Sequence, residues 1–569
     1  MKMKYPFEMF KEEVLNQLEE AIKKLYNLKV EIRVEKPEEI ADLAFPCFYL
    51  SKILNKNPKE ISSEIAKAIS TKNWIGKVEA INGYVNFFIN VDKLSNDIIP
   101  KIHEMGDNFG KMDKKDIKVI VEHTSANPNG PLHVGRARNP IIGDTIARLL
   151  KFGGYNVITQ YYVDDMGKQV ATLLWGVENL GKEIKIENKK PDHKYVIFYQ
   201  KASQLMEKEE KIRKEIEEII RECEKGNKKI LEKIRKVYKK VLDGIIESLK
   251  TLNIDIDEFV EESKFVLDGS VERVLKDLEK IPYVKKDGNA LYIDLEPFGI
   301  HGRDKKFYLT RSDGTSLYAT RDIAYHIWKG ERADLLINVL GEDHKLEAKF
   351  VEIALKLLNK KTPEVIFYAF VSLPEGRMST RKGRAIYLDD LIEEAMERAL
   401  NEIKKRFGKK EKIKIEYIAK NVAIGAIRYN IIKVKPEKAI IFKWEDALNF
   451  EGESAPFIQY AHARCCSILR KANKDYELKK LKFEHENEIK LIKKLAIFPE
   501  IIKECIKAKN PSILAEYSYK LASTFNSFYR DCRVIGSKKE EERLALVNAT
   551  RQVLKNCLNL LGIEALEEM

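Results

Sequence analysis

A strand, a helix and a second strand follow one another between residues 117 and 163, and this run constrains the fold more than any other feature. The strand IKVIVE begins at Ile117, a helix is predicted over Val134–Phe152, and NVITQYYV follows the stop at Gly153–Gly154. Two strands joined by a crossover helix pair in parallel. The run therefore predicts an α/β fold with a parallel sheet. Two later apolar runs suit further strands of that sheet: Leu335–Leu340 and Val365–Val371.

The four residues HVGR, His133–Arg136, lie at the mouth of the predicted helix. Gly135 lets a ligand approach the backbone closely, and the unpaired amides at a helix N-terminus attract anionic oxygens. The run Asn127–Pro131 predicts a rigid turn directly before it. His133 could therefore stabilise charge on a phosphate, although a histidine that only caps the helix would fit the same place.

A second group of cations follows the predicted strand Val365–Val371, in the loop GRMSTRKGR. Arg377, Arg381, Lys382 and Arg384 surround Met378–Ser379–Thr380 there. Positive charge that arrives in the transition state would favour the departure of pyrophosphate from ATP. A solvated basic loop without a ligand is the alternative.

The first 105 or so residues predict a small α+β unit. Helices are expected at Phe7–Tyr26 and Ile61–Ile69, and strands at Val30–Val34 and Gly83–Asn90. The lysine- and aspartate-rich linker Gly110–Asp116 ends the unit.

An insertion and a helical region account for the rest of the chain. Lys194–Glu224 and Lys228–Leu252 predict a charged helical hairpin, which could be a solvated face or an RNA contact. Asp287–Asn289 predicts a β-hairpin turn. After about Arg406, helical periodicity predicts a bundle, with helices at Ile415–Tyr429, Pro456–Ala472, Glu486–Lys507, Ser512–Arg530 and Lys538–Leu561.

Composition narrows the class of protein. A chain of 569 residues is long enough for several domains, and its net charge of +13 suits an acidic macromolecular partner such as nucleic acid, or only a lysine-rich proteome. The seven scattered cysteines form no CxxC pair, so we expect buried thiols and no zinc. No stretch of the sequence is apolar enough to span a membrane, and we expect a cytoplasmic protein.

HVGR and RMSTR resemble the HIGH and KMSKS signatures of class I aminoacyl-tRNA synthetases. Within that class, SANPNGPLHVGR, YATRDIAYHI and EGESAPFIQYAHAR resemble the arginyl-tRNA synthetase family. The resemblance implies ATP-dependent ligation of arginine to tRNA. It also implies a Rossmann-like catalytic domain at 111–395 with an insertion at 190–310, a tRNA D-loop-binding domain at 1–110 and a helical anticodon-binding domain at 396–569.

The resemblance also implies an arginine pocket. By motif position, Glu122, Tyr318 and Asp322 would surround the substrate, Asn127 would hold its backbone end, and Gln169 would lie nearby. Carboxylates suit a guanidinium, because they accept its forked hydrogen bonds. A glutamate at a strand end and an aspartate near a helix start are also common caps.

For ATP, the resemblance assigns His133, Gly135 and Arg136 to the nucleotide, and the GED element to the ribose. That element is Gly341–Asp343, and His344 follows it where related enzymes often carry glutamine. The chain departs from the family at Arg136, which replaces a histidine, and at Thr380, which replaces a lysine. Arg381 or Lys382, beside Met378 and Ser379, would then supply the positive charge of the second loop.

For tRNA, the resemblance points to Asn82, Tyr84 and Asn86, an aromatic flanked by amides that could read a splayed base or merely form a sheet edge. In the helical region, Trp444, Tyr460 and Arg464 could face the anticodon stem or belong to the core. We expect tRNA(Arg), L-arginine and ATP with Mg²⁺ as partners, and a monomer. Another class I synthetase, or a tRNA-binding paralogue without activity, remains an alternative.

Overall fold

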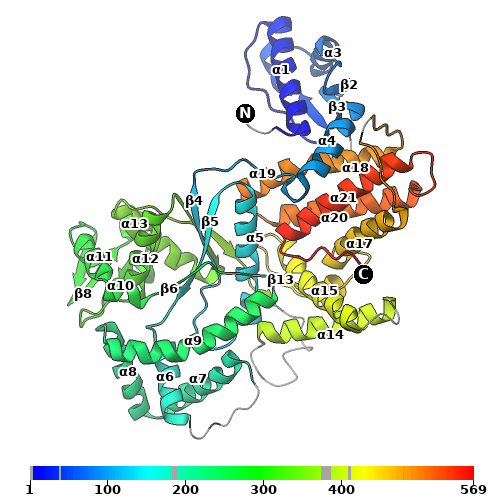
Figure 1. The fold of residues 1–569 in the computed structure, drawn as a ribbon. Coiled ribbons are helices and arrows are strands. Elements are labelled where there is room, and N and C mark those ends of the chain that lie inside the picture. Colours follow the sequence, from blue (N-terminus) through cyan, green and yellow to red (C-terminus); the bar gives the residue numbers. More distant parts are fainter. Residues whose placement is uncertain are drawn as a thin grey trace.

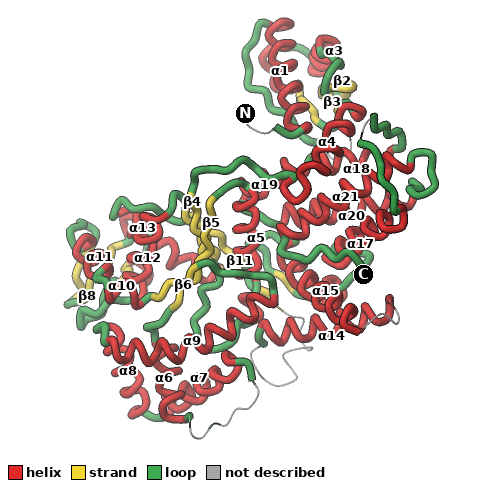
Figure 2. The backbone as a smooth tube through the Cα atoms, viewed as in Figure 1, coloured by secondary structure: helices red, strands yellow, loops and turns green. Residues whose placement is uncertain are grey.

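The structure is a computed structural model that describes residues 4–37, 40–181, 184, 189–372, 386–407, 412–478 and 480–569. A small N-terminal unit lies at one end of the molecule, a parallel sheet with its insertion at the other, and a helical region joins the two (Figure 1). Figure 2 shows the strands gathered at the centre of the sheet unit with helices on both sides. The fold is therefore of the expected α/β class.

The N-terminal unit packs four helices around a three-stranded antiparallel sheet of order β1-β3-β2. Its elements are α1 (Pro6–Tyr26), β1 (Leu43–Pro46), α2 (Phe48–Leu54), α3 (Pro58–Ala68), β2 (Ile75–Ile81), β3 (Tyr84–Ile89) and α4 (Val91–Met105). The side chains of Asn57 and Asn90 cap α3 and α4, which fixes where both helices begin.

The expected strand at Val30–Val34 is wrong. These described residues form no strand, and the neighbouring Glu35 makes only an isolated bridge to Ala44. Val30, Ile32 and Val34 still alternate inward and pack against the core. The alternation was real, but it reflects packing of an extended segment that has no strand beside it.

The central sheet has five parallel strands in the order β11-β10-β4-β5-β6. They are β4 (Lys118–Glu122), β5 (Asn156–Val163), β6 (Glu258–Glu261), β10 (Leu335–Gly341) and β11 (Glu364–Tyr368). Helix α5 (Arg138–Phe152) makes the predicted crossover from β4 to β5. The chain builds outward from β4 in both directions, so the carboxyl ends of β4 and β10 form the crevice where such sheets bind ligands.

The charged insertion is not a hairpin. Helix α6 (Lys168–Leu180) precedes the insertion, which comprises α7 (Pro191–Lys208), α8 (Glu210–Glu224) and α9 (Lys228–Thr251) before the antiparallel sheet. The helix expected at Lys194–Glu224 is broken at Glu209, whose backbone is extended. Helical periodicity on both sides of a single non-helical residue gave no sign of that break.

A separate antiparallel sheet of order β7-β8-β9 follows the insertion helices, and it contains the predicted hairpin. The elements are α10 (Ser263–Leu267), α11 (Ser270–Leu278), β7 (Val284–Asp287), β8 (Ala290–Asp294) and β9 (Lys306–Tyr308). Asp287 pairs with Ala290 across the turn, and Gly288 has a φ of 61°, which glycine adopts without strain. Helices α12 (Tyr318–Arg332) and α13 (Lys345–Leu357) then lead into and out of β10.

The last third of the chain is helical, as expected. It contains β12 (Val371–Ser372), α14 (Leu388–Phe407), α15 (Lys412–Ile432), β13 (Ile440–Ile441), α16 (Trp444–Ala447), α17 (Ala455–Ala472), α18 (Glu486–Ala496), α19 (Phe498–Ala508), α20 (Ser512–Asp531) and α21 (Glu540–Leu560). The single helix expected at Glu486–Lys507 is two helices, and Pro499 lies in the first turn of the second. Helix α14 begins before Arg406, where the sequence had not indicated a helix.

Helix α4 joins the N-terminal unit to the helical region. Asn96 exchanges two hydrogen bonds with the backbone of Leu481, and Gln552 donates to Asp107 just beyond α4. All seven cysteines are free and buried, as expected. Among the described residues, no helix is both long and apolar enough to cross a bilayer.

Candidate functional site

The HVGR residues form a tight turn at the carboxyl edge of the sheet. His133 caps the short 3-10 helix Val134–Arg136, and its Nδ1 accepts from the backbone N–H of Gly135 at 3.0 Å. Partial burial and the nearby positive charge of Arg136 lower the pKa of His133 below its usual value. A neutral imidazole that accepts at Nδ1 carries its proton on Nε2, which leaves a donor for a ligand.

The turn is tied to the chain that flanks the second signature loop. Val134 donates its backbone N–H to Ile386 at 3.0 Å, and Leu388 donates to Leu132 at 2.7 Å. A Cβ added to Gly135 would lie 3.1 Å from Nδ1 of His133 and 3.6 Å from the carbonyl of Val371. Both ends of the segment that carries the second loop therefore adjoin the HVGR turn.

The second signature itself lies outside the described residues. Arg377, Met378, Ser379, Thr380, Arg381, Lys382 and Arg384 all fall within residues 373–385. Their expected roles stay predictions.

Two polar side chains that we had not singled out hold the turn in place. Arg138 is fully buried and donates to the carbonyls of Ala369, Val434, Lys435 and Lys438. Asn139 accepts from the backbone of Thr124 at 2.6 Å and donates to Val339 at 3.0 Å. The polar pair Arg138–Asn139 in the first turn of a largely buried helix was the available signal.

The GED element lies against the HVGR turn. Nη2 of Arg136 donates to Oδ2 of Asp343 at 3.0 Å, and the Arg136 guanidinium lies 5.7 Å from the ring centre of Phe370. Both charged side chains are well exposed. A Cβ on Gly341 would lie 2.3 Å from Oδ1 of Asp343, so a side chain there would push the carboxylate out of this position.

His344 and Tyr318 meet at Glu347, on α13. Nδ1 of His344 lies 2.9 Å from Oε2 of Glu347, and this hydrogen bond raises the pKa of His344. The Tyr318 hydroxyl donates to Oε1 of the same carboxylate at 2.9 Å. Burial, with the hydrogen bond to Glu347, raises the pKa of Tyr318 to about 12, so the phenol stays protonated.

The remaining residues of the predicted arginine pocket form two further groups. Nδ2 of Asn127 donates to Oε1 of Gln169 at 3.0 Å, which joins the two residues expected near the substrate's backbone end. Oδ1 of Asp322 lies 3.1 Å from Nδ1 of His326, and a third of the Asp322 side chain is exposed. Burial opposes ionisation of Asp322, but His326 and Lys329 outweigh it and lower the pKa.

Glu122 is already engaged by protein groups. Its Oε2 accepts from Nζ of Lys329 at 2.6 Å, and its Oε1 accepts from the Ser125 hydroxyl at 3.1 Å. Both members of the Glu122–Lys329 ion pair are buried. Sequence reasoning placed Glu122 near the pocket but missed Lys329.

A buried ion pair beside the pocket was also missed. Glu262 pairs with Arg321, the residue before Asp322, and both are buried. Burial raises the pKa of Glu262 to about 8 despite the Arg321 charge. The Tyr162 hydroxyl is buried and has no hydrogen-bond partner among the described residues. Burial and the charges of Glu262 and Asp322 raise its pKa.

The N-terminal residues expected to read tRNA divide between surface and core. Asn82 has a φ of 49° and is exposed in the turn between β2 and β3, and the Tyr84 ring lies 5.2 Å from Phe48 in an edge arrangement. Asn86 is only 3% exposed, so it faces the interior of the unit. Asn82 and Tyr84 therefore remain accessible to a ligand, whereas Asn86 does not face solvent.

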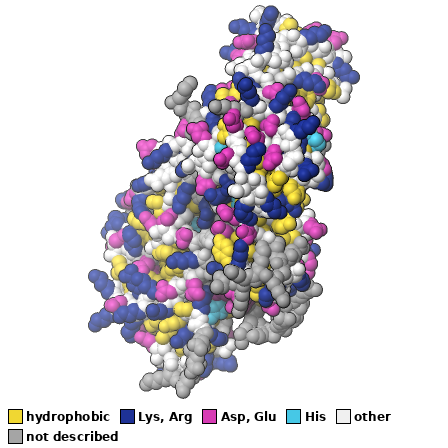
Figure 3. Space-filling model, turned by 45° about the vertical axis from the view of Figure 1, so that its right-hand side comes forward, with side chains coloured by type: hydrophobic (Ala, Val, Ile, Leu, Met, Phe, Trp, Pro, Cys, Tyr) yellow, Lys and Arg dark blue, Asp and Glu magenta, His cyan; other side chains and the backbone are white. Residues whose placement is uncertain are grey.

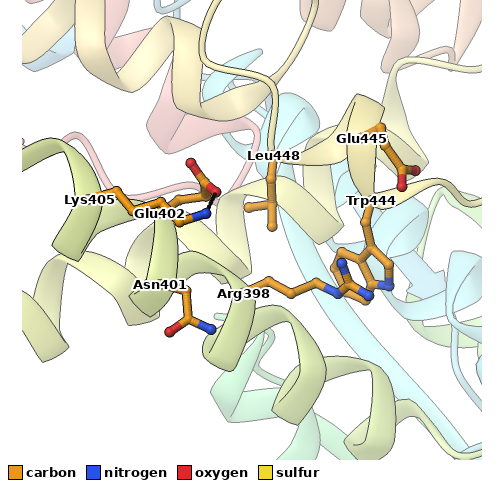
Figure 4. A pocket seen from close by; sticks show the side chains of 7 residues that line it. All are labelled: Arg398, Asn401, Glu402, Lys405, Trp444, Glu445 and Leu448. Atoms are coloured by element: carbon orange, nitrogen blue, oxygen red, sulfur yellow. Dashed lines mark hydrogen bonds and ion pairs between the residues drawn. The ribbon is translucent and has the colours of Figure 1, made fainter.

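In the helical region, Tyr460 and Arg464 form one surface cluster and Trp444 lies elsewhere. The Arg464 guanidinium lies 4.7 Å from the ring centre of Tyr460 and 4.8 Å from that of Tyr529. Trp444 is largely buried and lines a small cavity between α14 and α16 (Figure 4). Arg398, Asn401 and Lys405 line the other wall, and the Arg398 guanidinium lies 5.2 Å from the Trp444 ring centre.

Family models match most of the chain. Residues 98–444 match the model described as tRNA synthetases class I (R), catalytic domain, and residues 458–569 match the DALR anticodon binding domain. Residues 11–89 match the arginyl tRNA synthetase N terminal domain.

Curated relatives match over nearly the whole length. Arginine–tRNA ligase of Methanocella arvoryzae is 48% identical over 528 residues, which is 92% of each chain. The ligase of Methanocaldococcus jannaschii is 44% identical over 97% of this chain and 98% of its own. The solved arginyl-tRNA synthetase of Thermus thermophilus superposes with a TM-score of 0.82 at 29% identity, covering 98% of this chain and 99% of that one.

Proposed function

We propose how the described side chains divide the work of catalysis, from the premise that the chain belongs to the arginyl-tRNA synthetase family. The reaction is ATP-dependent ligation of arginine to tRNA. In the first step, a carboxylate oxygen of arginine attacks the α-phosphorus of ATP and pyrophosphate leaves. In the second, a hydroxyl of the tRNA's terminal adenosine attacks the arginyl carbonyl, loses its proton, and AMP leaves.

ATP binds across the HVGR turn and the GED element. The Nε2–H of His133 faces the phosphates, Gly135 lets them approach the backbone closely, and Asp343 accepts from the ribose hydroxyls. The 3.0 Å contact between Arg136 and Asp343 supports this assignment, because it brings a phosphate-binding cation beside the ribose-binding carboxylate. ATP would carry Mg²⁺ with it, Met378 contacts the nucleotide, and Ser379, Arg381 and Lys382 act on the leaving pyrophosphate.

Arginine binds at the N-terminal end of α12. Asp322 has an ionised, partly exposed carboxylate, and it suits the substrate guanidinium, with the Tyr318 hydroxyl beside it. Asn127 and Gln169, joined by a hydrogen bond, hold the substrate's backbone end. Glu122 lines the same crevice with its charge already paired.

tRNA lies along the N-terminal and helical units. Asn82 and Tyr84 present an exposed amide and an aromatic ring for a splayed base, and Asn86 supports their strand. Tyr460 and Arg464 face the anticodon arm, and Trp444 supports the wall of the separate cavity between α14 and α16. We propose that a monomer carries out the reaction in the cytoplasm and transfers arginine to the 2′-hydroxyl.

This assignment of roles rests on one observation. The HVGR turn, Asp343 and the α12 side chains lie together at the carboxyl ends of β4 and β10. ATP–pyrophosphate exchange, measured with arginine and tRNA, tests this assignment. Asp322→Ala should abolish arginine-dependent exchange while ATP binding persists. A variant that exchanges normally would place the arginine pocket elsewhere.

The choice of amino acid separates the two alternatives. Exchange with another amino acid but not with arginine would indicate a different class I synthetase. tRNA binding without exchange for any amino acid would indicate a paralogue that has lost catalysis.

A further inference from the structure

Lys329 is a fully buried lysine at the back of the predicted arginine pocket. Its side chain has no exposure, although it ends in an ammonium group. Nζ donates to Oε2 of Glu122 at 2.6 Å and to Oδ1 of Asn338 at 3.0 Å. It also lies 4.2 Å from the ring centre of Tyr325. A buried ammonium is costly unless it is paired and hydrogen-bonded, and these contacts meet that need.

The contacts continue from Lys329 to the pocket surface. Nδ2 of Asn338 donates to Nε2 of His326 at 2.8 Å. Nδ1 of His326 then donates to the backbone carbonyl of Asp322 at 2.8 Å and lies 3.1 Å from its carboxylate. An acceptor at Nε2 and a donor at Nδ1 define one tautomer of a neutral imidazole. The order of the contacts therefore fixes which way the His326 ring faces.

The backbone explains why these groups meet. His326 and Lys329 lie four and seven residues after Asp322, so the three side chains share one face of α12. Glu122, the last residue of β4, is the paired neighbour of Asn338, in the middle of β10. The helix face thus lies on the two strands whose carboxyl ends form the ligand crevice.

We propose that Lys329 is a positioning residue for arginine recognition, which rests on the function proposed above. It neutralises Glu122 and, through Asn338 and His326, fixes the Asp322 carboxylate in the direction that receives the guanidinium. Glu122 and Asp322 are the two carboxylates expected in the pocket. Of these, Asp322 alone then meets the substrate with an uncompensated negative charge. Glu122 contributes to the pocket as half of a neutral pair.

The first test is the Lys329→Met variant, measured by arginine-dependent exchange in the full-length protein with tRNA present. The KM for arginine should rise about tenfold or more, the size expected when one charge-assisted network is lost, while the KM for ATP stays unchanged. Lys329→Arg keeps the charge and should recover part of the arginine affinity. Arg332→Met, on the same helix but paired with Glu258, is the control and should leave the KM for arginine unchanged.

A double-mutant cycle tests whether Lys329 acts through Asp322. If it does, Lys329→Met should add little to the loss in kcat/KM for arginine that Asp322→Asn already causes. Independent, multiplicative losses would overturn the proposal, and so would a Lys329→Met variant whose KM values for arginine and ATP rise alike. A structural role alone would produce either of those results.

Asn338→Leu keeps the proposal testable if Lys329→Met does not fold. This variant leaves the Lys329–Glu122 pair intact and removes the Asn338 link to His326, so that only the longer 3.4 Å contact between Nζ of Lys329 and Nε2 of His326 remains. It should therefore raise the KM for arginine alone and show the same non-additivity with Asp322→Asn. An unchanged KM for arginine would contradict the proposal. If the wild-type protein shows no arginine-dependent exchange, the proposed function fails; if it does and these variants do not change arginine affinity, only Lys329 is misassigned.

Discussion

Arg136 shows what a single residue contributes where the chain departs from its family's signature. The resemblance predicted a histidine at this position, and the arginine instead reaches Asp343, 207 positions along the chain, at 3.0 Å. Histidine is too short to span the same gap while keeping a forked donor geometry. The departure therefore links the HVGR turn directly to the GED element.

Replacing Arg136 should affect ATP use and leave stability unchanged. Arg136→Ala should raise the KM for ATP about tenfold, the factor for one lost charge-assisted contact. The free energy of unfolding should change by less than about 0.5 kcal/mol, because the ion pair is exposed. ATP titrations in the exchange assay and chemical denaturation measure the two effects. A large loss of stability with an unchanged KM for ATP would contradict a ligand-binding role.

Single residues also show where sequence reasoning stops. His133, Gly135 and Asp343 were predictable because each belongs to a short motif with a fixed spacing. Lys329 was not, because a lysine in a charged helix looks like any solvated lysine until the strands beneath it are known. Burial of that side chain follows from tertiary packing, which no local pattern encodes.

At the scale of elements, the insertion is fastened to the start of α14, directly after the second signature loop. Asp389 lies 2.7 Å from Nε2 of His193 and 2.6 Å from Nζ of Lys190, and it also accepts from the Ser248 hydroxyl. Asp192, His193 and Asp389 are close enough to share a cation, but the Lys190 ammonium already lies between the two carboxylates. This cluster connects α7, α9 and α14.

The cluster gives the connection a pH window. The hydrogen bond between His193 and Asp389 raises the pKa of His193 above its usual 6.5. The stabilisation from this pair is therefore complete below pH 6.5 and is lost as the histidine deprotonates at higher pH. Hydrogen bonds from His193, Lys190 and Ser248 outweigh burial and lower the pKa of Asp389 from 3.8 to about 2, so stabilisation is lost again as the pH falls toward that value. The stabilisation is greatest between these limits.

His193→Gln should remove this dependence. The difference in unfolding free energy between wild type and variant should be largest between about pH 4 and 6.5 and shrink above it. Denaturation at a series of pH values measures it, with His301→Gln, an exposed histidine, as control. A difference that stays constant with pH would contradict the role of the His193–Asp389 pair.

Elements also differ in how well the sequence predicts them. The crossover α5 and its strands follow from continuous apolar runs between clear stops. The break at Glu209, the short edge strand β6 and the separation of α18 from α19 depend on packing or on a change at one residue. The expected domain boundary near residue 395 falls within α14, and it stays a prediction.

The net positive charge of the whole molecule is not gathered into one basic patch on the face that Figure 3 shows. On the face seen in Figure 3, Lys and Arg side chains are intermixed with Asp and Glu, although the net charge is +13. Contacts to tRNA phosphates therefore depend on particular cations, and total charge is a poor guide to them. Arg464, held between Tyr460 and Tyr529, is the candidate in the helical region.

Removing Arg464 should weaken tRNA binding without changing the active site. Arg464→Ala should lower tRNA affinity about tenfold and reduce the slope of log affinity against log salt by about one, as expected for one lost phosphate contact. Exchange at saturating tRNA should stay unchanged. Arg470→Ala, on the same helix but bonded to the carbonyl of Glu567, is the control for filter binding at several salt concentrations. Equal losses in both variants would rule out a specific contact.

Direct measurement of the charged product tests whether the crevice at β4 and β10 activates arginine and delivers it to tRNA. Purified protein, ATP with Mg²⁺, tRNA(Arg) and each amino acid in turn would be assayed for acid-stable aminoacyl-tRNA. We predict arginyl-tRNA alone, lost when Mg²⁺ is chelated and lost in Asp322→Ala. Charging with a different amino acid, or unchanged arginine charging by Asp322→Ala, would contradict this assignment of the crevice.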